Sequence, residues 1–252
     1  MSRRGRKYTE EQEVEMLEDI MKTPQNSTLK NLKVEFKFKN QTQKRFANQI
    51  EEREIVMCAG PPGTGKTYIA CAQALKLFKN DPRYKKIYIL KSVTTLKDEE
   101  IGFLKGTMEE KMEPFVYSFI HNFEKISSHQ VISQLRETKV IEVMPIAYTR
   151  GINFDDCIVL IDECQNLTKD HLKTLVTRIG YNCKMVLLGD TGQIDRKIKS
   201  ESGFAYTMRK LSNCDEVGII DFQEEEIVRN PIIKKILEHL EERPETIITP
   251  VS

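Results

Sequence analysis

The sequence predicts an α/β protein with a doubly wound, mostly parallel sheet and helices on both faces. Short apolar runs rich in β-branched residues alternate with helical patterns along the chain, which is typical of buried parallel strands joined by crossover helices. In addition, the first of these runs leads directly into a glycine-rich turn and a helical pattern. A chain of 252 residues is long enough for one large domain with appendages, but not for two complete cores.

The predicted strands are continuous apolar runs at residues 54–59, 86–90, 140–144, 157–162, 184–189 and 217–222. The predicted helices lie at residues 66–79, 107–137, 169–179, 202–212 and 231–243. Residues 1–30 are predicted to be an appendage, because a basic tail leads into one amphipathic helix with Val14, Leu17 and Met21 on a single face, followed by a linker. Residues 31–252 then form a single domain.

Composition and residue patterns argue against a protein with a Cys/His metal site and against a membrane-spanning one. The net charge is +1, so bulk charge does not indicate a nucleic-acid partner, but basic residues gather in 1–10 and 28–48. Such runs are compatible with a polyanion contact and are also typical of solvated faces. The six cysteines form no CxxC pair and the four histidines no metal-binding pattern. No apolar run is long enough to span a membrane, so we expect a cytoplasmic protein with free thiols.

The glycine-rich turn matches the complete phosphate-loop pattern G-x-x-x-x-G-K-T between a strand and a helix. Its backbone N–H groups are expected to wrap a phosphate chain at the positive end of the following helix. Lys66 supplies a charge for the β and γ phosphates, and the Thr67 hydroxyl is a predicted Mg²⁺ ligand. The sequence therefore predicts a nucleoside triphosphate site formed by Gly60, Pro61, Pro62, Gly63, Thr64, Gly65, Lys66, Thr67 and Tyr68.

Two acids, Asp162 and Glu163, end the fourth predicted strand. The carboxyl ends of parallel strands face the ligand crevice of an open α/β sheet. Asp162 is therefore predicted to bind the magnesium ion near Thr67, either directly or through one of the ion's ligands. Glu163 points elsewhere, as suits a base that orients or deprotonates water. An acidic turn at a strand end without catalytic function is the alternative.

A further polar turn follows the fifth predicted strand and contains Gln193. This glutamine is predicted to hydrogen-bond a γ-phosphate or the attacking water. A turn-forming Gly-Asp pair explains the pattern nearly as well.

Together these residues resemble the PhoH-like family of P-loop ATPases, which is related to the motor domains of superfamily-one helicases. The resemblance runs from about residue 43 to residue 240 and includes Gly-Phe-Leu at 102–104 and Ala-Tyr-x-Arg-Gly at 147–151. Further matching segments lie at 161–166, 177–180, 189–195 and 228–231. The resemblance implies a RecA-like P-loop NTPase fold and hydrolysis of ATP with Mg²⁺.

The resemblance also implies roles for residues outside the loop. Gln43 lies where related motors place a glutamine that reads adenine, which favours ATP over GTP; a surface glutamine is the alternative. Tyr148 and Arg150 resemble the segment that lies across the nucleic-acid-facing side, although Tyr148 equally suits packing. Lys91 stands where the family usually has an arginine, and it would replace that residue's charge in a nucleic-acid contact without its planar fork.

Helicase motors place ATP between two cores, so the resemblance implies a homo-oligomer, such as a hexameric ring, in which a second copy completes the site. Arg229 is the predicted arginine acting in trans, with Arg178 as the second candidate; an ion pair between Arg229 and residues 224–226 is the alternative. The predicted function is Mg²⁺-dependent ATP hydrolysis coupled to movement on, or remodelling of, RNA or single-stranded DNA. The alternatives are a ring-forming ATPase that acts on proteins and a nucleotide-gated binding module with little turnover.

Overall fold

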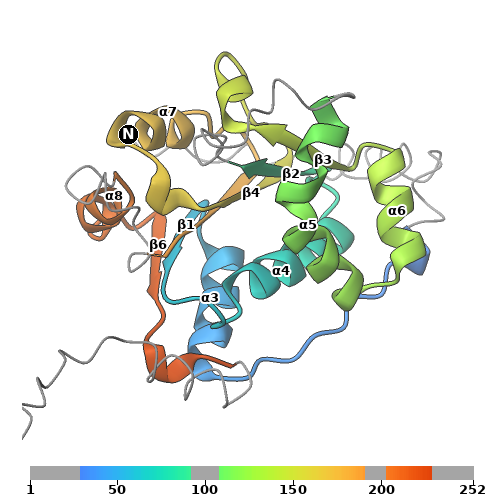
Figure 1. The fold of residues 1–252 in the computed structure, drawn as a ribbon, viewed down its shortest axis with the longest axis horizontal. Helices are drawn as coiled ribbons and strands as arrows, with labels where there is room; N and C mark the ends of the chain where they lie inside the picture. The colour runs from blue at the N-terminus through green and yellow to red at the C-terminus, as the bar shows by residue number, and fades with distance from the viewer. Residues whose placement is uncertain (1–28, 92–107, 191–202, 229–252) are drawn as a thin grey trace, which may run out of the picture.

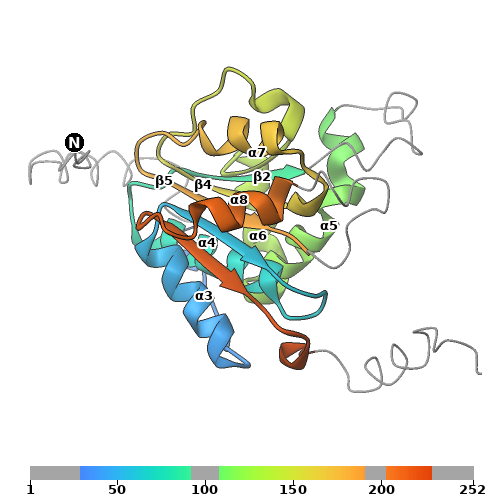
Figure 2. The ribbon, with the colours of Figure 1, turned by 90° about the vertical axis from the view of Figure 1, so that its left-hand side faces the viewer.

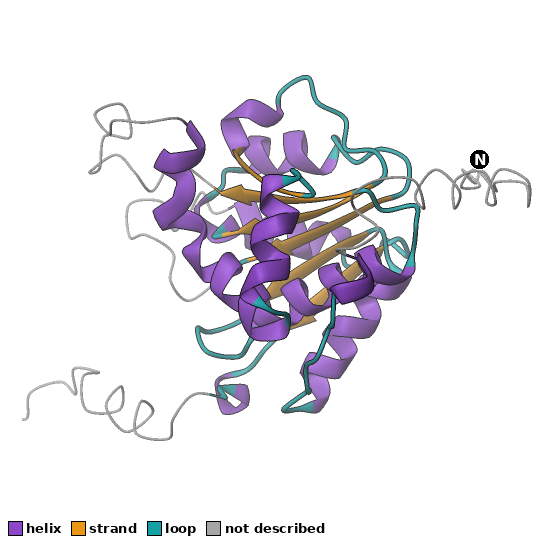
Figure 3. Cartoon of the chain, turned by 90° about the vertical axis from the view of Figure 1, so that its right-hand side faces the viewer, coloured by secondary structure: helices purple, strands orange, loops and turns teal. Residues whose placement is uncertain are grey.

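The sheet of this protein is six-stranded and wholly parallel, with the strand order β3-β2-β4-β5-β1-β6 (Figures 1 and 3). The computed structural model describes residues 29–91, 108–190 and 203–228. The predicted fold class is confirmed, and each predicted strand lies within one residue of the observed bounds. The strands are β1 (Ile55–Ala59), β2 (Lys86–Lys91), β3 (Ile141–Pro145), β4 (Cys157–Asp162), β5 (Cys183–Leu188) and β6 (Val217–Asp221).

Helices cover both faces of the sheet, as Figure 2 shows. Alternate strand residues point to opposite faces, so Ile158 and Leu160 of β4 join one core cluster and Val159 and Ile161 the other. The first cluster is covered by α3 (Gln41–Glu52), α4 (Lys66–Asn80), α5 (Met108–Ile126) and α6 (His129–Glu137). The second is covered by α7 (Lys169–Val176) and α8 (Gly203–Leu211). Short 3-10 turns η3 (Ile146–Thr149), η4 (Cys164–Asn166) and η5 (Glu224–Glu226) follow β3, β4 and β6.

The structure corrects the helix predictions in two places. The single helix predicted at 107–137 is two helices, because the Ser128 side chain accepts a hydrogen bond from Val131 N and starts α6 anew. Helix α3 was not predicted, although Asn40 caps it and its buried positions, Gln43, Phe46, Ala47 and Ile50, follow helical spacing. The helix predicted at 231–243 and nearly all of the 1–30 appendage lie outside the described residues.

The strand order decides where the site lies. The strand that precedes the phosphate loop, β1, and the strand that ends in the two acids, β4, are not neighbours, because β5 pairs with both of them. All three strands are parallel, so their carboxyl ends meet at one edge of the sheet. The phosphate loop, the Gly189–Asp190 turn after β5 and the acid pair after β4 are thereby brought together at this edge, where open α/β sheets bind ligands.

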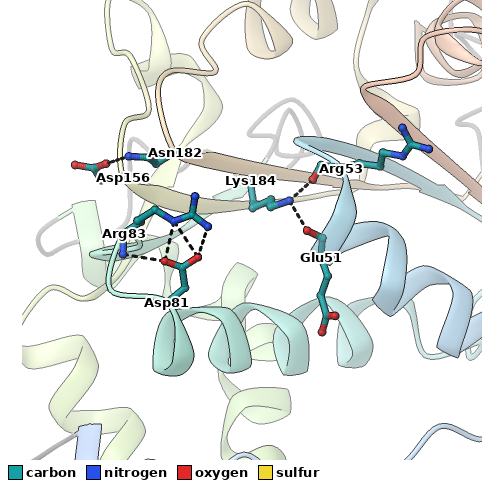
Figure 4. Close-up of polar contacts among 7 residues, drawn as sticks. All are labelled: Glu51, Arg53, Asp81, Arg83, Asp156, Asn182 and Lys184. Carbon is teal, nitrogen blue, oxygen red and sulfur yellow. Dashed lines mark hydrogen bonds and ion pairs between the residues drawn. The ribbon is translucent and has the colours of Figure 1, made fainter. Parts of the chain in front are cut away.

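The opposite edge of the sheet is held by polar contacts that involve no pocket residue (Figure 4). Lys184 of β5 donates hydrogen bonds to the carbonyls of Glu51 and Arg53, at 2.8 and 2.6 Å, and so satisfies the end of α3. Burial lowers the pKa of Lys184. Beyond the end of α4, Arg83 forms a bidentate pair with Asp81. The Lys184 bonds thus join the C-terminal end of α3 to β5, and the Arg83–Asp81 pair stabilises the turn after α4.

No helix among the described residues is both long enough and apolar enough to cross a membrane.

Candidate nucleotide-binding site

The phosphate loop is shaped by two glycines at positions that exclude a side chain. Gly60 has a φ of 139°, and a Cβ there would lie 2.5 Å from the Cβ of Phe222. Gly65 has a φ of 88°, and its Cβ would lie 2.7 Å from the Gln43 amide nitrogen. Both conformations belong to the region that only glycine adopts without strain. The loop therefore follows β1 closely against the chain after β6, and Val228 N donates to the Gly63 carbonyl at 3.0 Å.

Lys66 begins α4 at the inner end of the loop. Its Nζ donates hydrogen bonds to the carbonyls of Gly60 and Pro61, at 2.6 and 2.8 Å. Burial lowers the pKa of this ammonium, and the surrounding anionic groups, Asp190 and Asp162 among them, act in the opposite direction. A triphosphate in the loop would add acceptors for the same Nζ and favour its charged form.

Gln43 supports the loop from behind. Its side chain is buried, and its Nε2 donates to the Thr64 carbonyl at 2.8 Å while its Oε1 accepts from Lys39 N at 2.8 Å. The alternative of a surface glutamine is therefore wrong. The structure does not test adenine recognition by Gln43, which stays a prediction.

Gln43→Leu should weaken binding of ATP and GTP alike by roughly tenfold, because the Thr64 carbonyl loses its donor and the loop is less well ordered. An adenine contact would add a further loss for ATP alone. Titration of a fluorescent ATP and GTP analogue measures both effects, with Gln41→Leu on the exposed side of α3 as the control. Unchanged GTP affinity in Gln43→Leu would contradict the role of Gln43 in supporting the phosphate loop.

The two acids lie on the opposite side of the pocket from the loop. Asp162 ends β4 with its side chain 16% exposed, and burial raises the pKa of its carboxyl group. Its Oδ1 accepts a hydrogen bond from Glu163 N at 3.0 Å. Glu163 has a φ of 56°, an uncommon left-handed conformation for this residue type. The Glu163 side chain is 40% exposed, against 16% for that of Asp162.

Lys91 lies beside these acids. Its Nζ is 3.6 Å from Asp162 Oδ2 and 3.9 Å from Glu163 Oε1, and its side chain is only 13% exposed. The register places Lys91 opposite Asp162 at the ends of β2 and β4. Its charge lowers the pKa of Asp162, against the effect of burial. Lys91 is thus a second cation of the nucleotide pocket, and its predicted nucleic-acid contact stays a prediction.

Gln165 links the acids to the end of β5, and the sequence analysis missed it. This buried side chain donates from Nε2 to Glu163 Oε2 at 2.5 Å and accepts from Asp190 N at 3.0 Å through Oε1. It therefore holds the proposed base in place relative to the neighbouring strand. The sequence signals for it were its position two residues after Glu163 and its place in the matching segment at 161–166.

These groups enclose a pocket of about 350 Å³. Two polar residues of α5, Ser118 and Asn122, complete its wall, and neither was predicted because neither belongs to a recognised motif. They are one turn apart on the helix and so face the same way. The pocket is lined by Pro62, Gly63, Gly65, Lys66, Thr67, Tyr68, Lys91, Ser118, Asn122, Asp162, Glu163, Gln165, Gly189 and Asp190.

The pocket residues fit a magnesium ion. Thr67 and Asp162 line the same cavity, and an ion bound there would add to Lys91 in offsetting the desolvation of the Asp162 carboxylate. Mg²⁺ takes hard oxygen ligands and commonly uses one or two protein groups together with substrate phosphates and water. Among the residues that the structure describes, no cluster of three or more His, Cys, Asp or Glu side chains offers a fully protein-made metal site.

The other predicted site residues lie apart from the pocket or outside the described residues. Tyr148, in η3 after β3, is 57% exposed, so its ring is not packed in the core, and Arg150 beside it is exposed. Arg178 follows α7, and its carbonyl accepts from Phe154 N near the start of β4, at the edge opposite the pocket. Gln193 and Arg229 lie outside the described residues.

Comparison with known proteins agrees with this geometry. The family model described as "PhoH-like protein" matches residues 35–241. A PhoH-like protein of Bacillus subtilis is 33% identical over 200 residues, which cover 79% of this chain and 62% of the relative. Protein PhoH of Escherichia coli K12 is 30% identical over 204 residues, which cover 79% of this chain and 56% of the relative. The chain thus spans about three fifths of the length of these relatives.

Among solved structures, the large terminase of a thermophilic bacteriophage is similar in fold, with a TM-score of 0.50 and 9% identity. The similarity covers 81% of this chain and 50% of the terminase. This likeness supports the P-loop fold alone. The family model extends from the residues before α3 to beyond the last described residue, and it includes the loop, both acids and Gln165. The chain therefore belongs to the PhoH-like protein family.

Proposed function

We propose that this protein is a Mg²⁺-dependent ATPase that couples hydrolysis to binding, translocation on or remodelling of RNA or single-stranded DNA. One observation carries the hydrolytic part: the phosphate-loop lysine and the Asp162–Glu163 pair line a single pocket of about 350 Å³.

Each of the charged and polar groups discussed above has a proposed part in this reaction. The loop amides and Lys66 would hold the β and γ phosphates. Asp162 and Thr67 would hold the ion, which would neutralise charge on the phosphates when bound. Glu163 accepts a proton from, or orients, the attacking water while Gln165 keeps its carboxylate in place. Lys91 offsets part of the acids' charge and lines the same cavity as Lys66.

Coupling to nucleic acid is the finer part of the proposal. It is supported by the family resemblance and by the exposed Tyr148 and Arg150 after β3, because an aromatic ring beside a guanidinium suits base stacking and phosphate contact. Steady-state ATPase assays with and without oligo-U and oligo-dT, at two salt concentrations, test it. Stimulation that falls with salt is expected, since phosphate contacts release counterions. Turnover indifferent to both polymers would favour action on proteins, and nucleotide binding without turnover would favour a gated module.

An oligomer is also part of the proposal. The described residues that line the pocket include two lysines but no arginine, and P-loop enzymes commonly use an arginine from a second copy, with an effect of about 10³–10⁵ on rate. Arg229 is the proposed residue and Arg178 the second candidate.

Mixing Arg229→Ala subunits with Glu163→Gln subunits tests the shared site. Each variant alone should be inactive, and the mixture should recover part of the ATPase activity, because some interfaces then combine an intact Glu163 with an intact Arg229. A monomeric mass in solution together with no recovery would reject the oligomer and the trans arginine.

A further inference from the structure

A cluster of three cations surrounds one tyrosine on the sheet face away from the phosphate-loop helix. The Tyr206 ring of α8 has Lys169 Nζ 4.2 Å from its centroid, and Arg209 Cζ and Lys210 Nζ each 5.8 Å away. Tyr206 is half-buried, and the three basic residues are exposed. We call these four residues the Tyr206 patch.

Two helices build the patch in a fixed arrangement. Arg209 and Lys210 follow Tyr206 by three and four positions on α8, so all three share one helix face. Lys169 is the first residue of α7, after the cap Thr168. The starts of α7 and α8 are in close contact, because Gly203 N donates to the Leu167 carbonyl at 2.9 Å and a Cβ on Gly203 would lie 2.4 Å from Lys169 N. Figures 1 and 2 show the two helices side by side.

The charge of the patch is not neutralised by the described parts of the chain. No carboxylate there forms a salt bridge with Lys169, Arg209 or Lys210. Three like charges around one ring repel one another, and the electron-rich face of Tyr206 offsets only part of that repulsion. An arrangement of this kind is pre-organised for a ligand that carries several negative charges at regular spacing.

We infer that the Tyr206 patch binds the phosphodiester backbone of single-stranded nucleic acid. This inference rests on the proposed function and assigns part of its nucleic-acid contact to α7 and α8 in addition to the segment after β3. A nucleic-acid backbone suits the patch better than a single phosphate does, because its cations come from two helices and spread around the ring. Along the chain, only η4 and residues 167–168 separate Glu163 from Lys169 at the start of α7.

The test compares two triple variants that remove the same charge. Lys169→Gln/Arg209→Gln/Lys210→Gln removes the patch, and Lys44→Gln/Lys79→Gln/Lys125→Gln removes three exposed lysines from α3, α4 and α5 on the other face. Binding of labelled oligo-U and oligo-dT is measured by fluorescence anisotropy across a range of salt. Loss of three phosphate contacts should weaken binding about 100-fold at 0.1 M salt and reduce the slope of log K against log salt by about 2. The control triple variant should change the affinity and the salt slope much less.

Basal ATPase activity and thermal stabilisation by MgATP should be unchanged in the patch variant. These two measurements check that the variant is folded. Tyr206→Leu keeps the charges but loosens their arrangement, so it should weaken binding about fivefold. Equal losses in the two triple variants, or tighter patch-dependent binding of poly-glutamate than of the oligonucleotides, would overturn the inference. Wild-type protein that binds neither oligonucleotide would instead refute the nucleic-acid part of the proposed function itself.

Discussion

Lys66→Ala is expected to weaken MgATP binding at least about 100-fold and to abolish turnover. The reason is that the variant removes the charged donor at the inner end of the phosphate loop, and losing one charge-assisted contact in a desolvated site costs about 3 kcal/mol. The same Nζ donates hydrogen bonds to the Gly60 and Pro61 carbonyls, so the variant also removes two contacts that hold the loop. Thr67→Ala should give a similar loss in the presence of Mg²⁺.

Equilibrium titration with a fluorescent ATP analogue measures this effect. Lys76→Ala is the matched control, because Lys76 lies on the same helix, is partly exposed and pairs with Glu51 away from the pocket. The control should bind MgATP like the wild type, since exposed ion pairs contribute little. ATP affinity close to wild type in Lys66→Ala would refute the phosphate-loop assignment.

Glu163→Gln is expected to bind MgATP normally while losing turnover by about 10²-fold or more, the usual scale of general-base loss. The amide keeps the size of the side chain and an oxygen for the Gln165 Nε2 hydrogen bond, but it no longer accepts a proton from water. Single-turnover hydrolysis separates this loss from binding. Glu142→Gln, on β3 and paired with Lys86 away from the pocket, is the control.

Asp162→Asn should separate the two acids. Removing the Asp162 charge should mainly weaken the Mg²⁺ dependence of nucleotide binding, because this buried carboxylate is the proposed ion ligand. Undiminished hydrolysis in Glu163→Gln would place the base on another residue, whereas unchanged Mg²⁺ dependence in Asp162→Asn would remove Asp162 from the metal site.

Lys91 shows how the tertiary structure changes the meaning of a residue. In the sequence it stands at the end of a strand, where the resemblance indicates a nucleic-acid contact. In the structure β2 and β4 are neighbours, so Lys91 lies beside Asp162 and within the nucleotide pocket. A single sequence does not reveal which strands pair, because strand order depends on crossovers that pass over other strands.

Local patterns were sufficient for the elements themselves. All six strands and the loop–helix junction at Lys66 follow from apolar runs and glycine placement, since a buried parallel strand must be apolar on both faces. Helix α3 was missed, although its spacing was present and Gln43 within it was a predicted site residue. The break at Ser128 was missed because a cap depends on one side-chain hydrogen bond rather than on periodicity.

By itself, the sequence determined the fold class, the phosphate loop and the acid pair, because each depends on residue types at short, fixed spacing. Only the tertiary structure decided that β5 lies between the loop and the acids, that Gln165 joins the acid turn to Asp190, and that Ser118 and Asn122 complete the pocket. It likewise brought Lys169 to Tyr206. These contacts join segments far apart in the chain, and their geometry comes from how helices and strands pack, which short-range spacing does not encode.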